Sequence, residues 1–108
     1  MKEIKTFIHR NRIADVVHAL VSANFNKGSY NLSISDVSGS LDALDDKEKD
    51  YSIEFGEGMI TEAKLELICE DDRVDEAVAL IKENGRTGQA IAGWVYVLDI
   101  SSISAIES

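Results

Sequence analysis

The chain has 108 residues, of which 44% are hydrophobic and 29% are charged, and this composition predicts one soluble globular domain spanning residues 1–108. Twenty acidic against eleven basic side chains give a formal net charge of −9, which disfavours nucleic acid and anionic membrane surfaces as partners. A single cysteine excludes an internal disulfide. Because no apolar run approaches the roughly 18 residues of a membrane span, we expect a cytoplasmic protein without direct membrane insertion.

The first third of the chain predicts a strand, a helix and a second strand. Apolar and polar residues alternate with period two over residues 1–9 and again over residues 30–37, which is typical of strands. Between them, residues 13–21 carry apolar side chains at i, i+3, i+4, i+7 and i+8, the stripe of an amphipathic helix. Asn11 is a candidate N-cap for this helix, which we expect to end near Asn24.

The second half repeats this plan. Residues 63–69 alternate as a third strand, and residues 94–100 are β-branched and aromatic, as in a fourth. An apolar stripe over residues 74–81 predicts a second helix, with the two aspartates at 71–72 offering N-cap oxygens. Gly85 stands where a left-handed C-cap is expected.

Two successive strand-helix-strand units predict an α+β, ferredoxin-like (βαβ-βαβ) fold. Its four-stranded antiparallel sheet has two helices on one face. The strands nevertheless carry apolar residues on both faces, for example Phe7 beside Ile8 and Trp94 beside Val95. The face without helices therefore predicts burial against other copies of the chain.

Residues 38–59 form a long connection between the two halves, and they show no stable periodicity. Connections longer than about 12 to 15 residues without secondary structure are usually either functional or disordered. Seven acidic and two basic side chains lie in this central loop. It is the functional candidate of the sequence, and a solvated, mobile hairpin is the open alternative.

The order of these elements and several motifs resemble the PII (nitrogen regulatory) signal-transduction family. The similarity lies in residues 1–5 (MKEIK), 15–20 (DVVHAL), 64–67 (KLEL), 70–76 (EDDRVDE) and 86–88 (RTG). It extends over nearly the whole chain except the middle of the central loop and the tail. The loop also contains Tyr51, which resembles the tyrosine that some members have modified by nucleotidylation.

Similarity to this family implies a homotrimer of ferredoxin-like subunits with three clefts between subunits. The clefts would hold ATP, ADP or AMP as an effector, and the flexible loop would dock onto a target enzyme or transporter. The chain would then be a regulator, not an enzyme. The residues that the resemblance assigns to ligand contact are Gly39, Lys64, Arg86, Thr87, Gly88, Gln89 and Gly93.

Three departures from the family pattern remove charges that a triphosphate needs. The family's Gly-Asp-Gly-Lys is replaced by IAGW at residues 91–94, the bases expected just after Gly39 by SLD at 40–42, and the C-terminal arginines by SAIES at 104–108. Phosphates are held by charge-assisted donors. We therefore expect ADP or AMP to bind at least as well as ATP.

A second hypothesis is a PII-like sensor of a divalent metal or small anion, linked to a transporter. Its donors would be His9, which can face a subunit boundary, His18 on a helix flank, and Cys69, which also fits a small core residue. Their spacing is not that of a zinc site, although oligomeric packing can bring copies together. A third class, an enzyme of ferredoxin-like fold, lacks a nucleophile with a base, paired carboxylates and a phosphate-binding loop ending in Lys-Ser/Thr.

Overall fold

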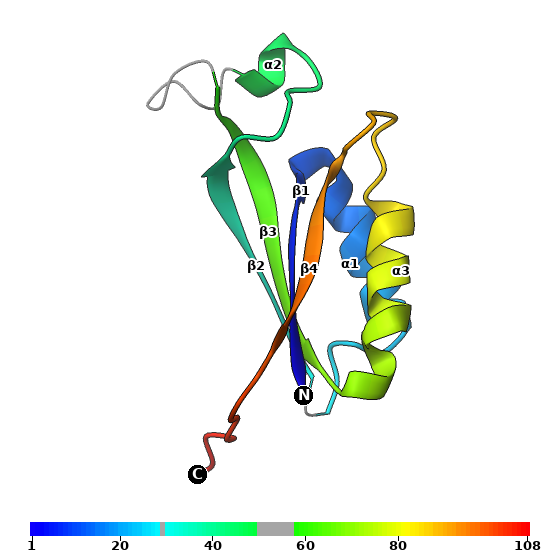
Figure 1. The fold of residues 1–108 in the computed structure, drawn as a ribbon, viewed down its shortest axis with the longest axis vertical. Helices are drawn as coiled ribbons and strands as arrows, with labels where there is room; N and C mark the ends of the chain where they lie inside the picture. Colours follow the sequence, from blue (N-terminus) through cyan, green and yellow to red (C-terminus); the bar gives the residue numbers. More distant parts are fainter. Residues whose placement is uncertain (29, 50–57) are drawn as a thin grey trace.

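The computed structural model describes residues 1–28, 30–49 and 58–108, and it shows a four-stranded antiparallel sheet with two helices on one face (Figure 1). The strand order is β2-β3-β1-β4, so the predicted ferredoxin-like fold is confirmed. Within these residues, every helix is too short or too polar to cross a lipid bilayer. The elements are β1 (Lys2–His9), η1 (Arg10–Arg12), α1 (Ile13–Ser22), β2 (Asn31–Gly39), α2 (Asp46–Lys49), β3 (Ile60–Cys69), η3 (Asp71–Arg73), α3 (Val74–Asn84) and β4 (Gly93–Asp99).

Both long helices occupy the predicted residues but are capped differently from the sequence prediction. Asn11 and the aspartates at 71–72 lie inside short 3₁₀ turns that precede the helices, and no side-chain cap forms at either start. At the end of α3, Gly85 has φ −88°, so the predicted left-handed cap is wrong. Instead, the Arg12 guanidinium donates hydrogen bonds of 3.1 and 2.9 Å to the carbonyl of Asn84, which satisfies an orphan acceptor of the helix end.

The core lies between the sheet and the two long helices. Alternate residues of β1 point into it, so Ile4, Thr6 and Ile8 are buried together with Val16 and Leu20 of α1. Each strand and each helix has one apolar face, and the apolar face of the sheet packs against the apolar faces of the two helices. Cys69 is fully buried in the same cluster, as predicted. Burial raises the pKa of its thiol, which makes the thiolate a poor candidate for a metal ligand.

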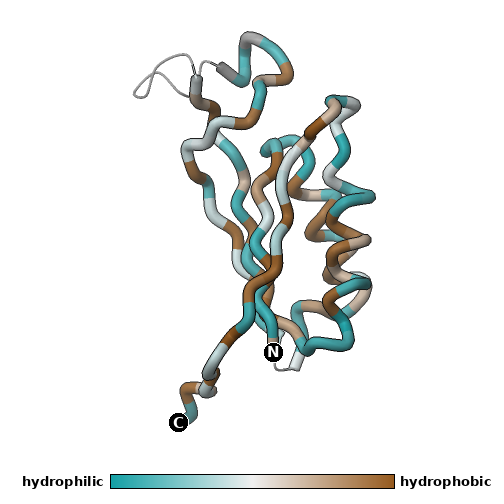
Figure 2. Tube along the Cα trace, viewed as in Figure 1, coloured by the Kyte–Doolittle hydropathy of each residue, from teal (hydrophilic) through white to brown (hydrophobic). Residues whose placement is uncertain are grey.

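The opposite face of the sheet is open and partly apolar. The rings of Phe7 and Tyr96 stack there with centroids 6.0 Å apart, and the side chain of Trp94 is 59% exposed. Leu98 is also exposed, and Figure 2 marks apolar segments along β4. The predicted uncovered face is therefore present, whereas its burial against other copies stays a prediction.

Part of the central loop has regular structure, which the sequence analysis does not predict. β2 runs on to Gly39, which pairs with Ile60 of β3, so the sheet includes the first residues of this segment. The short helix α2 follows, and the Asp45 carboxylate accepts a 3.0 Å hydrogen bond from the Glu48 N–H. Tyr51 and its proposed modification lie outside the described residues.

Candidate functional site

A cavity of about 470 Å³ lies between the end of α3 and the beginning of β4, and we call it the α3–β4 cavity. The connection from α3 to β4 forms much of its wall. Four of the seven predicted ligand residues line it, namely Arg86, Gly88, Gln89 and Gly93. The fold thus brings together the part of the predicted site that is contiguous in the chain.

The cavity combines cationic and apolar walls. Lys82 of the last turn of α3 and Arg86, which follows the end of this helix, both line it, so the cavity has two positive charges in its walls. Thr6 also lines the cavity, and its buried hydroxyl has no hydrogen-bond partner within the part of the chain that the structure describes. Ile8 and Ile81 supply apolar surface. Such walls suit a ligand that has an anionic group and an apolar body.

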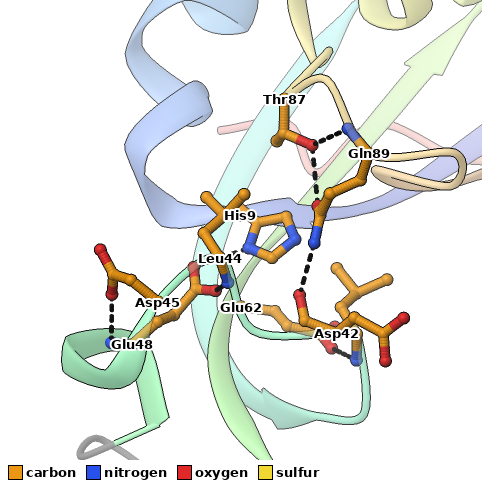
Figure 3. Close-up of polar contacts among 9 residues, drawn as sticks. His9, Asp42, Leu44, Asp45, Glu48, Glu62, Thr87 and Gln89 are labelled. Carbon is orange, nitrogen blue, oxygen red and sulfur yellow. Dashed lines mark hydrogen bonds and ion pairs between the residues drawn. The ribbon is translucent and has the colours of Figure 1, made fainter.

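The turn that borders this cavity is connected to the central loop. Gly88 has φ +92°, a conformation that favours glycine. The Thr87 hydroxyl donates to Gln89 Oε1 at 2.7 Å, and Gln89 Nε2 donates a 3.0 Å hydrogen bond to the carbonyl of Asp42 (Figure 3). A ligand that moves Gln89 therefore acts on the first residues of the loop.

A second, smaller cavity of about 290 Å³ lies at the base of the loop, and we call it the Glu62 pocket. Gly39, another predicted ligand residue, lines this pocket rather than the first. Glu62 of β3 is only 3% exposed, and its carboxylate accepts a 2.9 Å hydrogen bond from the Leu41 N–H. A methyl group on Gly39 would stand 2.0 Å from the Glu62 carboxyl carbon. Glycine is required here because the carboxylate lies directly against the backbone.

A buried histidine holds the next part of the loop. His9 is fully buried, and its Nδ1 lies 2.6 Å from Glu48 Oε2 (Figure 3). The other oxygen of Glu48 accepts a 2.6 Å hydrogen bond from the Leu44 N–H. In the single subunit His9 thus lies beneath the loop, and its position at a subunit boundary stays a prediction.

Of the other predicted residues, Thr87 lies in the turn beside the α3–β4 cavity, whereas the remaining four line neither cavity. Lys64 is on the open face of β3, where its Nζ is 3.6 Å from Glu66 Oε1. His9 and Cys69 lie at opposite ends of the β1–β3 pair, and His18 is exposed on α1. Within residues 1–28, 30–49 and 58–108, no group of three His, Cys, Asp or Glu side chains is placed to hold a metal ion.

Several site residues were not found from the sequence. Lys82 carries a weak signal, since it is a lysine near the C-terminal end of a predicted helix. Thr6 is an ordinary residue of the predicted first strand, and Glu62 precedes the predicted third strand of residues 63–69 and carries no signal. Their roles depend on which segments fold over them.

The split βαβ fold, the cation-lined cavity and the loop connected to its wall define a small domain of the ferredoxin-like class with one candidate ligand cavity beside its central loop. The sequence profile of the family described as "Nitrogen regulatory protein P-II" matches residues 1–108, the whole chain. The chain therefore belongs to the PII family. It is a signal-transduction regulator connected with nitrogen regulation, and not an enzyme.

Individual relatives are distant but match over the full length. The chain is 25% identical to nitrogen regulatory protein P-II 1 of Methanothermobacter thermautotrophicus over 108 residues, covering 100% of this chain and 90% of that protein. It is 25% identical to nitrogen regulatory protein P-II of Porphyra purpurea and 26% identical to that of Microchaete diplosiphon, in each case covering 100% of this chain and 93% of the relative. The chain is thus a divergent member.

Proposed function

We propose that this PII-family protein is a homotrimer that senses an adenine nucleotide in its inter-subunit clefts. The effector's phosphate contacts the α3–β4 cavity, and the state of the site is passed to a target enzyme or transporter through residues 38–59. The observation that supports this most is the clustering of Arg86, Gly88, Gln89 and Gly93 around one cavity that also contains Lys82. We expect the protein to act in the cytoplasm.

The open face of the sheet supports the trimer. Trp94, Tyr96 and Leu98 alternate along β4 on this face, each between 38% and 59% exposed. Burying apolar area releases about 25 cal/mol per Å², so this face favours association with further copies. Light scattering should give about three times the 11.9 kDa subunit mass, and a clean monomer at micromolar concentration would contradict the assembly.

The hydrogen bond from Gln89 to the carbonyl of Asp42 supports transmission to the loop. Ligand contact with Arg86 or Gly88 acts on the same short turn that contains Gln89. Occupancy therefore alters how firmly residues 40–49 are held, which is an order-disorder type of switch. Hydrogen exchange over these residues should change when nucleotide is added.

Titration calorimetry with ATP, ADP and AMP tests the effector. Lys82 and Arg86 are the two basic side chains that line the cavity, so we expect ADP or AMP to bind at least as tightly as ATP. A tenfold or greater preference for ATP would contradict this expectation. Saturation at 100 times the Kd should also stabilise the fold by about 2.7 kcal/mol in a thermal shift.

Paired charge variants locate the site. Arg86→Gln removes a charge-assisted contact and should weaken nucleotide binding by about tenfold to a hundredfold. Lys27→Gln is the control, since Lys27 is exposed in the turn before β2 and does not line the cavity. If both variants bind like the original chain, the nucleotide is not held here.

Binding of a small anion is the second candidate, supported by the unpartnered Thr6 hydroxyl beside the two cations. Titration with phosphate or bicarbonate tests it. An anion sensor would be favoured over a nucleotide sensor by two results together. The protein would bind none of the three nucleotides, and its saturable anion binding would be lost in Arg86→Gln.

A further inference from the structure

The Glu62 pocket has a different chemistry from the α3–β4 cavity. Its walls include a buried carboxylate and two aromatic side chains, those of Phe7 and Trp94. Glu62 is 3% exposed, and the described side chains place no lysine or arginine nitrogen within 4.0 Å of its carboxylate. Among the described residues, its carboxylate accepts a hydrogen bond from the Leu41 N–H at 2.9 Å, which is a neutral backbone group. A carboxylate that is this deeply buried needs a compensating charge.

The surroundings add negative charge. The next carboxylate, that of Glu48, is held by His9 with Nδ1 at 2.6 Å. Asp42 and Asp45 follow in the same part of the loop, and both are exposed. The pocket therefore repels phosphate and attracts cations, in contrast to the cavity that contains Lys82 and Arg86.

The aromatic walls decide which kind of cation fits. The cavity of about 290 Å³ is larger than a bare metal ion needs, and the described residues around it do not supply three metal-ligating side chains. Indole is the best cation–π partner among side chains, and a carboxylate beside aromatic rings is the usual environment of alkylammonium groups. We propose that the Glu62 pocket binds an organic ammonium ion, with the cation against Glu62 and its alkyl groups against Trp94 and Phe7. The pocket shares Trp94 with the α3–β4 cavity, and Gly39 of the predicted ligand contacts also lines it, but its buried carboxylate selects a cation where the other cavity selects an anion.

Choline chloride is the probe, and 3,3-dimethylbutan-1-ol is its neutral control, because the alcohol has nearly the same shape as choline and carries no charge. Trp94 is the only tryptophan of the chain and lines both cavities, so its fluorescence is followed with choline in the absence of nucleotide. We expect a saturable change with choline and binding at least about tenfold weaker for the neutral alcohol. Equal binding of both compounds, or no change with choline up to about 0.1 M, would overturn the proposal.

Glu62→Gln removes the charge and keeps an oxygen that accepts the Leu41 N–H. This variant should bind choline about tenfold more weakly or worse. Glu66→Gln is the matched control, because Glu66 lies on the same strand and the same open face but does not line the pocket. Equal weakening by both variants would indicate a general effect of net charge and would overturn the site.

A second variant avoids dependence on the folding of Glu62→Gln. Trp94→Leu, followed by calorimetry instead of fluorescence, should also weaken choline binding, and an unchanged affinity would count against the aromatic contact. ADP titration into Glu62→Gln keeps the two hypotheses distinguishable. Choline binding without ADP binding removes only the nucleotide proposal, and ADP binding without choline binding removes only this inference.

Discussion

Gly39 is the position where one added methyl group tests how the central loop is held. A Cβ at this residue would lie 2.0 Å from the carboxyl carbon of Glu62 and 2.0 and 2.2 Å from its oxygens. Gly39 also pairs with Ile60 in the sheet, so its backbone has little room to move. In Gly39→Ala the Glu62 side chain must therefore leave its place, and the Leu41 N–H loses its acceptor.

The cost follows from what is displaced. A partly buried N–H without a partner costs about 1 to 3 kcal/mol, and Leu41 is only half-buried, so we expect a loss of about 1 to 2 kcal/mol. For a domain of this size, that corresponds to a fall in Tm of about 5 to 10 °C. Because a trimer unfolds in a concentration-dependent way, all variants must be compared at one protein concentration.

A double-mutant cycle separates this contact from a general glycine effect. In a Glu62→Ala background the methyl group added by Gly39→Ala has space, so the same substitution should cost less than about 0.5 kcal/mol. Gly58→Ala is the matched control, since a Cβ there meets nothing within 4 Å. An equal cost of Gly39→Ala in both backgrounds would refute the proposed packing of Glu62 on Gly39.

Three further predictions concern the cavity and the core. Gly93→Ala would place a Cβ 2.4 Å from the carbonyl oxygen of Phe7, so β4 must move away from β1, and urea denaturation should show a loss of about 1 to 3 kcal/mol, well above the Gly58→Ala control. Gln89→Leu removes the donor to the Asp42 carbonyl and should speed hydrogen exchange around residue 42 without a large change in Tm; unchanged exchange would contradict the connection between cavity and loop. Because burial raises the pKa of Cys69, the unfolded chain loses the thiol proton at lower pH than the folded chain, so stability should fall as pH rises through about 8.5, and Cys69→Ala should show a smaller fall.

Local patterns were sufficient to predict the four strands and the two long helices, but not the short helix α2. The stripes of α1 and α3 and the alternation of the four strands each report one buried face, and that information lies within a few neighbouring residues. The ends of elements were predicted less well because they depend on distant partners. β2 extends to Gly39, which pairs with Ile60, and at the end of α3 the carbonyl of Asn84 is bound by the distant Arg12 and not by a left-handed glycine cap.

The candidate site divides in the same way. Arg86, Gly88, Gln89 and Gly93 follow one another along the chain, so a resemblance over a short motif was enough to find them. Lys82 comes from the preceding helix, where a lysine in the last turn is common for electrostatic reasons alone. Such a residue becomes part of a site only when the turn that follows it folds back over the helix end.

Glu62 shows why the rest required the structure. Its alternation along β3 places it on the face of the sheet that the helices do not cover, where a carboxylate is normally solvated. It is buried because residues 40–48 return over the end of the sheet and are held there through Leu41 and through Glu48 on His9. Glu62 is therefore buried only while residues 40–48 lie over the end of the sheet. Any ligand that neutralises Glu62 therefore stabilises this part of the loop, and any partner that draws the loop away exposes the carboxylate to water.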